Sequence, residues 1–115
     1  MKLTDATRAL GALGEPTRLT IFRLLVEAGQ EGLVVGKIAE NLAVSAGTLS
    51  FHLKTLSHAG LIRSTRHGTF IRYVADFDAM NGLVAFLTEN CCGGHPERCA
   101  PGVCEASDPE IPHAA

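Results

Sequence analysis

The sequence lacks tryptophan and has a single tyrosine, so five phenylalanines supply nearly all of its aromatic side chains. Aliphatic residues must therefore form most of the core, and 115 residues suffice for one compact domain. Long apolar stretches are missing too. No run approaches the ~20 residues that span a bilayer, and the N-terminus has no signal-peptide pattern. We therefore expect a cytoplasmic protein without a membrane partner.

Acidic side chains are missing from a long central segment. No Asp or Glu occurs between residues 41 and 75, although the net charge of the chain is −2. Residues 76–115, by contrast, hold seven acidic residues and one base, Arg98. Because a carboxylate would repel a phosphate backbone, the acid-free segment favours a surface that faces nucleic acid. Its basic residues and histidines are Lys54, Arg63, Arg66, Arg72, His52, His58 and His67.

Cysteine is absent from the first 90 residues, and all four cysteines fall within the fourteen residues that follow. Thiols stay reduced in the cytoplasm, so this cluster predicts an ion site or a redox switch rather than a disulfide framework. A CxxC motif, a glycine-rich phosphate loop and a Ser/His/Asp grouping are also missing, so we do not expect an enzyme. The cluster consists of Cys91, Cys92, Cys99 and Cys104.

The hydrophobic spacing predicts a mainly α fold with a small β-hairpin. We expect helices at residues 5–13, from Pro16 to Gly29, at 35–42, from an N-cap at Ser45 to Gly60, and from Asp76 or Asp78 to about Glu89. Two strands, at residues 61–65 and 70–75, are expected to join through residues 66–69. A tight helix pair followed by a hairpin is a winged helix-turn-helix.

This arrangement predicts a DNA-binding surface. The helix after Ser45 can enter the major groove, while the hairpin reaches the neighbouring groove or the backbone. Short hydroxyls and an imidazole can bond base edges or phosphates, and Lys and Arg add charge. The alternative is a small α+β domain of the same architecture that binds no DNA. The residues expected to contact double-stranded DNA are Ser45, Thr48, Ser50, His52, Lys54, Arg66 and Arg72.

Three segments resemble the ArsR/SmtB family of metalloregulatory repressors. Residues 45–62 (SAGTLSFHLKTLSHAGLI) resemble its recognition helix. Residues 13–22 (LGEPTRLTIF) resemble the start of its second helix. Residues 66–73 (RHGTFIRY) resemble its wing, which is the β-hairpin. The resemblance extends over roughly residues 8–90. It implies a homodimer that pairs through its first and fifth helices, occupies an operator with dyad symmetry and represses by blocking polymerase.

The cysteine spacing favours a soft ion as the inducer. Adjacent Cα atoms lie about 3.8 Å apart, so a disulfide between Cys91 and Cys92 would be strained. The same pair can clamp one large ion, and Gly93-Gly94 lets the chain reverse so that Cys99 supplies a third thiolate. Three sulfurs suit the trigonal pyramidal coordination of As(III) or Sb(III), whereas zinc requires a closed tetrahedral set.

Some members of the resembled family bind arsenite through a Cys-x-Cys motif at the start of the third helix. The matching positions here are Val34 and Gly36, and the fifth helix lacks the His and Asp pattern of zinc sensors. We therefore expect residues 1–90 to form the DNA-binding and dimerisation domain, 91–104 the inducer-binding segment and 105–115 a mobile tail. Alternatives are a thiol redox sensor, a zinc or cadmium site that adds Cys104, and a thiol-rich tail without a ligand.

Overall fold

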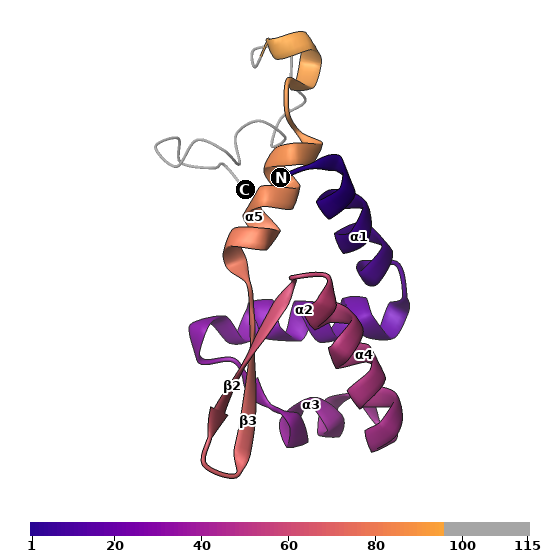
Figure 1. Cartoon of the computed structure of the whole chain (residues 1–115), viewed down its shortest axis with the longest axis vertical. Helices are drawn as coiled ribbons and strands as arrows, with labels where there is room; N and C mark the ends of the chain where they lie inside the picture. The colour runs from indigo at the N-terminus through magenta and orange to yellow at the C-terminus, as the bar shows by residue number, and fades with distance from the viewer. Residues whose placement is uncertain (96–115) are drawn as a thin grey trace. The chain divides into compact units, whose positions relative to one another are not determined.

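The structure is a computed structural model that describes residues 1–95 of the chain (Figure 1). Residues 1–83 form one compact unit, and a second unit begins at Val84. The mainly helical content and the small antiparallel sheet confirm the predicted fold class. The elements are α1 (Leu3–Leu13), α2 (Pro16–Ala28), the 3₁₀ turn η1 (Gly29–Glu31), β1 (Leu33–Val34), α3 (Val35–Leu42), α4 (Ala46–His58), β2 (Ile62–His67), β3 (Phe70–Ala75), α5 (Phe77–Leu87) and the 3₁₀ turn η2 (Cys91–Gly94).

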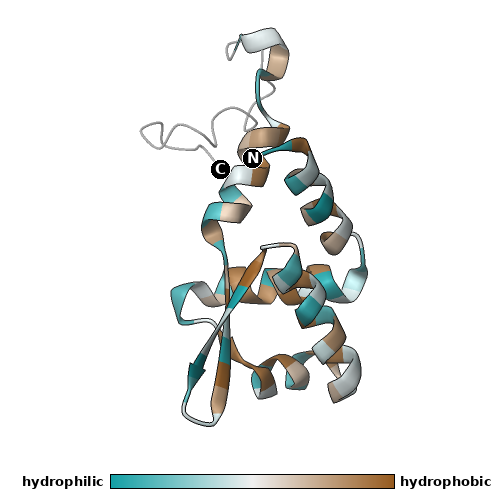
Figure 2. Cartoon of the chain, viewed as in Figure 1, coloured by the Kyte–Doolittle hydropathy of each residue, from teal (hydrophilic) through white to brown (hydrophobic). Residues whose placement is uncertain are grey.

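Aliphatic side chains form the core of the first unit, as the shortage of aromatics predicts. In Figure 2 the hydrophobic residues of α2, α3 and α4 lie where these helices approach one another. One face of α1 contributes only alanines to the core, whereas Leu10 is 44% exposed. The largest fully buried side chains are Ile21, Leu25, Ile38, Leu49, Leu56 and Leu61.

Short-range hydrogen bonds set the helix starts. The Glu15 carboxylate accepts the backbone N–H of Arg18 at 2.8 Å, and Pro16 occupies the first turn of α2, where no N–H is required. The bond from the Arg18 N–H lowers the pKa of Glu15 below its ordinary value. Asp76 likewise accepts the N–H of Ala79 at 3.0 Å and begins α5. These caps are the reason that the observed helix starts lie close to the expected ones.

The sheet has the order β1-β3-β2 and is antiparallel throughout. His67 pairs with Phe70, so the hairpin turn contains two residues rather than the four that we expected. Gly68 takes the first of these two positions with φ of 63°, as the tightest hairpin turns prefer. The predicted end of the first strand at residue 65 is therefore wrong, and Arg66 lies within β2.

A third strand, β1, was not predicted. Leu33 pairs with Tyr73 and Val34 with Arg72, which ties the start of α3 to the hairpin. Gly32 makes this pairing possible because it is buried against β3 with φ of 64°. Glycine is the residue that adopts such a conformation without strain.

The second unit contains the last turn of α5 and the two cysteines that the structure describes. The helix ends at Leu87, two residues before the expected end, and Asn90 then adopts a left-handed conformation. Cys99, Cys104 and the tail at 105–115 lie outside the described residues. Within residues 1–95, no helix is both long and apolar enough to cross a membrane.

Candidate nucleic-acid interface

Helices α3 and α4 meet through a three-residue turn. Ala43 closes α3 in a left-handed conformation, and its N–H donates to the carbonyl of Ala39 at 3.1 Å. Ser45 then caps α4, because its hydroxyl oxygen accepts the N–H of Thr48 at 3.2 Å. The two helices therefore form the predicted helix-turn-helix, with α4 in the position of the groove-reading helix. Figure 1 shows α3, α4 and the hairpin at the same end of the first unit.

Four of the seven predicted DNA contacts lie on α4 or at its cap with exposed side chains: Ser45, Thr48, Ser50 and Lys54. The Ser45 hydroxyl also donates to Oγ1 of Thr48 at 2.9 Å, so both hydroxyls are held at the helix N-terminus. Backbone N–H groups and the helix dipole favour a phosphate at such a position. Lys54 projects farther along the same helix and makes no ion pair within the described part of the chain.

His52 does not lie on the exposed face where we expected it. Its side chain is 8% exposed, because positions 49, 52, 53 and 56 form one stripe that packs on the core. Nδ1 of His52 lies 3.3 Å from Nη1 of Arg18, whose Nε donates to the carbonyl of Ala12 at 2.6 Å. Arg18 therefore connects the end of α1 to the groove-reading helix. His52 therefore lies beneath the exposed face of α4 that was predicted to contact DNA, rather than in it.

Replacing Arg18 with alanine is expected to lower the free energy of unfolding by about 1–3 kcal/mol, because the variant leaves the buried His52 ring without this partner. Chemical denaturation measures the change. Arg23→Ala is the matched control on the same helix: its ion pair with Glu27, at 3.9 Å, is well exposed and should contribute at most about 0.5 kcal/mol. Equal losses in the two variants would contradict the role of Arg18.

The two predicted wing arginines lie on opposite faces of the hairpin. Arg66 pairs with Ile71 and Arg72 with Thr65, and successive residues of a strand alternate between faces. Arg66 is exposed, whereas Arg72 is half-buried and its Nη1 donates to the carbonyl of Glu31 at 2.9 Å. Arg66 is therefore the more accessible charge for a phosphate contact, and Arg72 also fixes the base of the wing.

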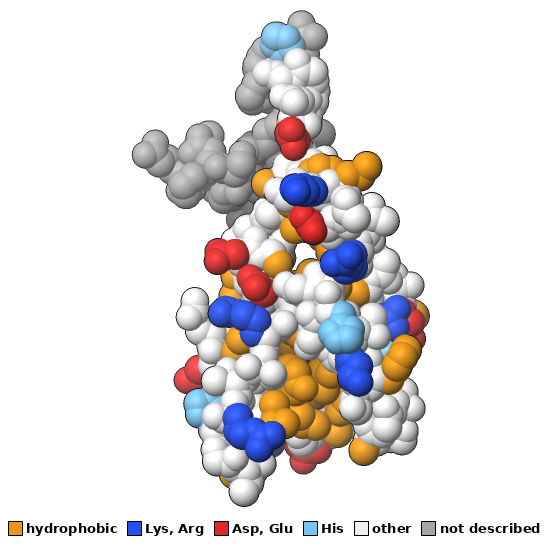
Figure 3. Space-filling model, in the orientation of Figure 1, with side chains coloured by type: hydrophobic (Ala, Val, Ile, Leu, Met, Phe, Trp, Pro, Cys, Tyr) orange, Lys and Arg blue, Asp and Glu red, His pale blue; other side chains and the backbone are white. Residues whose placement is uncertain are grey.

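An exposed aromatic residue on α4 was missed. Phe51 is 62% exposed, and its ring meets that of His52 edge-on with centroids 5.7 Å apart. Its position opposite the buried stripe could have been found from the same helical periodicity. On the face in Figure 3, basic side chains lie over the hairpin and over α4, with a hydrophobic area between them. This face of the first unit therefore carries basic groups around an apolar centre.

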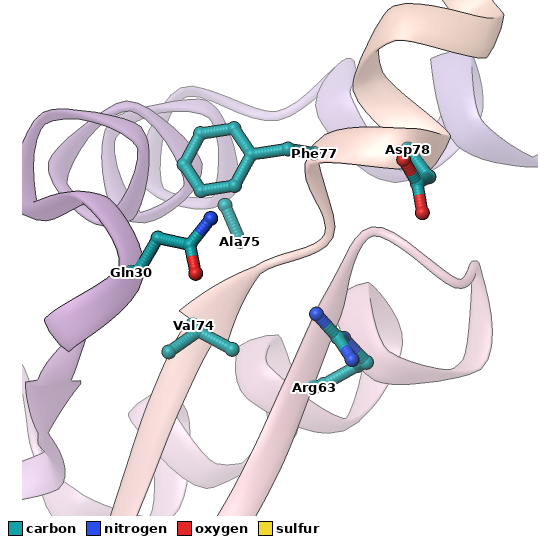
Figure 4. Close-up of a pocket in the computed structure, with 6 residues that line it drawn as sticks. All are labelled: Gln30, Arg63, Val74, Ala75, Phe77 and Asp78. Atoms are coloured by element: carbon teal, nitrogen blue, oxygen red, sulfur yellow. The ribbon is translucent and has the colours of Figure 1, made fainter.

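Two cavities flank the hairpin. One, of about 250 Å³, is lined by Val34, His67, Phe70 and Arg72. The other, of about 140 Å³, lies where β3 leads into α5. Figure 4 shows Phe77 and Ala75 on one side of it and Arg63 on the other. Arg63 also faces Asp76, with Nε to Oδ2 at 3.7 Å. The second cavity is also lined by Gln30, Val74 and Asp78.

Cys91 and Cys92 follow α5 after three intervening residues. Cys91 is half-buried and Cys92 is exposed. Cys92, Gly93 and Gly94 all have positive φ, from 56° to 84°, so the chain turns sharply there. Among residues 1–95, no three His, Cys, Asp or Glu side chains lie close enough to hold a metal ion. The third predicted ligand, Cys99, lies outside the described residues.

The fold and the exposed groups of α4 define a winged helix-turn-helix DNA-binding protein. A family model described as a helix-turn-helix domain matches residues 13–65. An uncharacterized HTH-type transcriptional regulator of Methanocaldococcus jannaschii is 33% identical over 88 residues, which cover 76% of this chain and 97% of that protein. The chain belongs to the ArsR family of helix-turn-helix transcriptional regulators.

Two further matches bear on function. The arsenical resistance operon repressor of Bacillus subtilis is 35% identical over 81 residues, which cover 70% of this chain and 73% of that protein. The homodimeric winged helix-turn-helix domain of a possible ArsR-family regulator of Mycobacterium bovis superposes with a TM-score of 0.61 at 28% identity, over 81% of this chain and 86% of that one. These relatives are regulators rather than enzymes, as predicted.

Proposed function

We propose that this protein is a homodimeric repressor that binds operator DNA and leaves it when As(III) or Sb(III) binds Cys91, Cys92 and Cys99. The adjacent pair of thiols just after α5 is the observation that carries the proposal. Membership of a family of DNA-binding regulators supplies its first half. The identity of the inducer follows from the chemistry of the sulfur donors.

The dimer is supported by the composition of α1. This helix buries Ala6, Ala9 and Ala12 but leaves Leu3 71% exposed and Leu10 44% exposed. Residues seven positions apart lie on the same face of a helix, so these two leucines form an apolar strip without cover in the monomer. A second copy of the chain covers such a strip in the proposed dimer. Two copies of α4 about 34 Å apart then read successive turns of the major groove.

The inducer is supported by the accessibility and spacing of the thiols. Each of three thiols displaces one hydroxyl group of arsenous acid, forms an As–S bond and releases one water molecule, so the exchange needs no oxidant. Cys92 is exposed to an incoming ion, and the adjacent Cys91 is within reach of the same atom. Binding at the end of α5 is expected to alter the dimer seam and hence the spacing of the two α4 helices.

The test is a gel shift on the DNA upstream of the protein's own gene, with reductant, with and without arsenite. We expect the dimer to retard the DNA, and arsenite to dissociate this protein–DNA complex. Release by peroxide alone would instead identify a redox sensor, and release by zinc or cadmium alone a metal sensor that uses a fourth ligand. A complex that none of these agents dissociates would contradict the proposed inducer. A protein that does not bind the DNA at all would contradict the proposed repressor function.

Lys54 provides a separate test of the DNA-facing side of α4. Lys54→Ala is expected to reduce the salt dependence of DNA binding, lowering the slope of log K against log [salt] by about one for each phosphate that the lysine neutralises in the wild type. Lys37→Ala is the matched control, because Lys37 lies on α3 and faces Glu40 at 3.5 Å. Fluorescence anisotropy titrations at several salt concentrations measure the slopes. An unchanged slope in Lys54→Ala would remove this residue from the interface.

A further inference from the structure

The centre of the outward face of α4 carries one exposed apolar side chain among polar ones. Positions 49, 52, 53 and 56 point into the core, so the centre of the opposite face contains Gly47, Phe51 and Lys54, with His58 at its C-terminal end. Gly47 has no side chain, and a Cβ built there would meet nothing within 4 Å. The first side chain to project from the middle of this face is therefore the phenyl ring of Phe51.

The small residues at the start of α4 bring the ring within reach of the base edges. Ala46 and Gly47 form the first turn, so the helix backbone can approach the floor of the major groove closely. A large polar side chain at either position would hold the helix away from it. Residues in the N-terminal half of a recognition helix are the ones that contact bases, and Phe51 is the sixth residue of this helix.

An aromatic ring in the major groove has one complementary apolar group to meet. Each base pair shows a distinct pattern there, and the C5-methyl of thymine is the apolar feature that a phenyl ring can cover. A ring exposed by 62% has most of its surface available for such a contact. The ring also lies beside His52, which is held by Arg18, so its position depends on a buried and fixed neighbour.

We infer that Phe51 is a specificity-determining residue that reads a thymine methyl group in each operator half-site. This inference rests on the proposed DNA-binding function and adds a base preference to it. Lys54 and the hydroxyls at the helix start then serve the phosphates, while the ring distinguishes thymine from the other bases. The preference should disappear when either the ring or the methyl group is removed.

The experiment selects the preferred site of the wild-type dimer from random-sequence duplexes and then replaces its thymines one at a time with uracil. Uracil keeps the base pairing and lacks only the methyl group. In the wild type, a single uracil at the position that Phe51 contacts is expected to weaken binding about fourfold, the value of one buried carbon. The Phe51→Ala variant should bind thymine and uracil duplexes equally, and Phe51→Leu should keep part of the difference.

Phe70→Ala is the matched control, since Phe70 is 64% exposed but lies on the hairpin. Removal of the Phe70 ring should leave the ratio of affinities for thymine and uracil duplexes unchanged, even if overall affinity for DNA falls. A penalty that persists unchanged in Phe51→Ala, or its absence at every thymine in the wild type, would overturn the inference while leaving the repressor function in place. A wild type that selects no sequence would contradict the proposed function itself. Matching thermal transitions establish that the variants are folded.

Discussion

Replacing either Cys91 or Cys92 with serine is expected to remove most of the release of DNA by arsenite. In the wild type, inducer binding should weaken operator affinity by about 5- to 150-fold, the usual range of coupling between two sites. A serine hydroxyl is a poor substitute for a soft sulfur ligand, so a variant that keeps only two of the three proposed thiol ligands should lose most of this response. Anisotropy titrations with and without arsenite measure the ratio of the two affinities for each variant.

Two controls separate the inducer site from the fold. Because Cys92 is exposed and Cys91 only half-buried, the serine variants should bind operator without arsenite as tightly as the wild type. Cys99→Ser should also lose the response, whereas Cys104→Ser should keep it if Cys104 is not a ligand. Continued release of DNA by the Cys91→Ser and Cys92→Ser variants would show that the inducer binds elsewhere.

Gly32→Ala is expected to cause the largest loss of stability of any single methyl group added to this chain's described glycines. Its new Cβ would collide with the carbonyl oxygen of Tyr73 and with the side chain of Val74. The backbone at Gly32, with φ of 64° and ψ of −163°, is also one that alanine adopts at a cost of about 1–3 kcal/mol. The collision adds about 1–3 kcal/mol more and should separate β1 from β3.

Gly29→Ala is the control that incurs the backbone cost without the collision. Gly29 has nearly the same backbone angles, φ of 71° and ψ of −151°, but nothing lies within 4 Å of the added carbon. Both variants therefore incur the conformational cost, and only Gly32→Ala incurs the collision. Urea denaturation of the two proteins gives the difference in free energy of unfolding. A similar loss in both would mean that β3 moves aside for the added carbon at no cost, and that the expected collision does not reduce stability.

The helices could be predicted because their evidence is local. Pro16 and Ser45 mark helix starts by their own chemistry, and the apolar spacing gives the rest. Strand β1 has only two residues, too few to show any periodicity, and it exists because β3 lies beside it. Such a strand depends on tertiary pairing that a single segment does not encode.

For the candidate site, the sequence predicted which kinds of residue are present better than it predicted where their side chains lie. The acid-free segment does contain the exposed hydroxyls and Lys54, yet His52 was assigned to the wrong side of α4 although its spacing from Leu49 and Leu56 marks it as buried. A two-residue error in the hairpin turn hid the fact that Arg66 and Arg72 lie on opposite faces. The partner of His52, Arg18, lies 34 residues away, and no local pattern connects them.

The pairing of β1 divides the hairpin into a stem and a tip with different stiffness. Tyr73 and Arg72 are paired on both sides, but within the described chain Ile71 and Phe70 pair with β2 alone, and Gly68 lies in the turn. Two-stranded ribbons twist more readily than wider sheets. In the proposed complex with DNA, the tip is therefore expected to follow flanking DNA of differing groove width while the stem stays in register, so that discrimination between operators falls to the helix beside it.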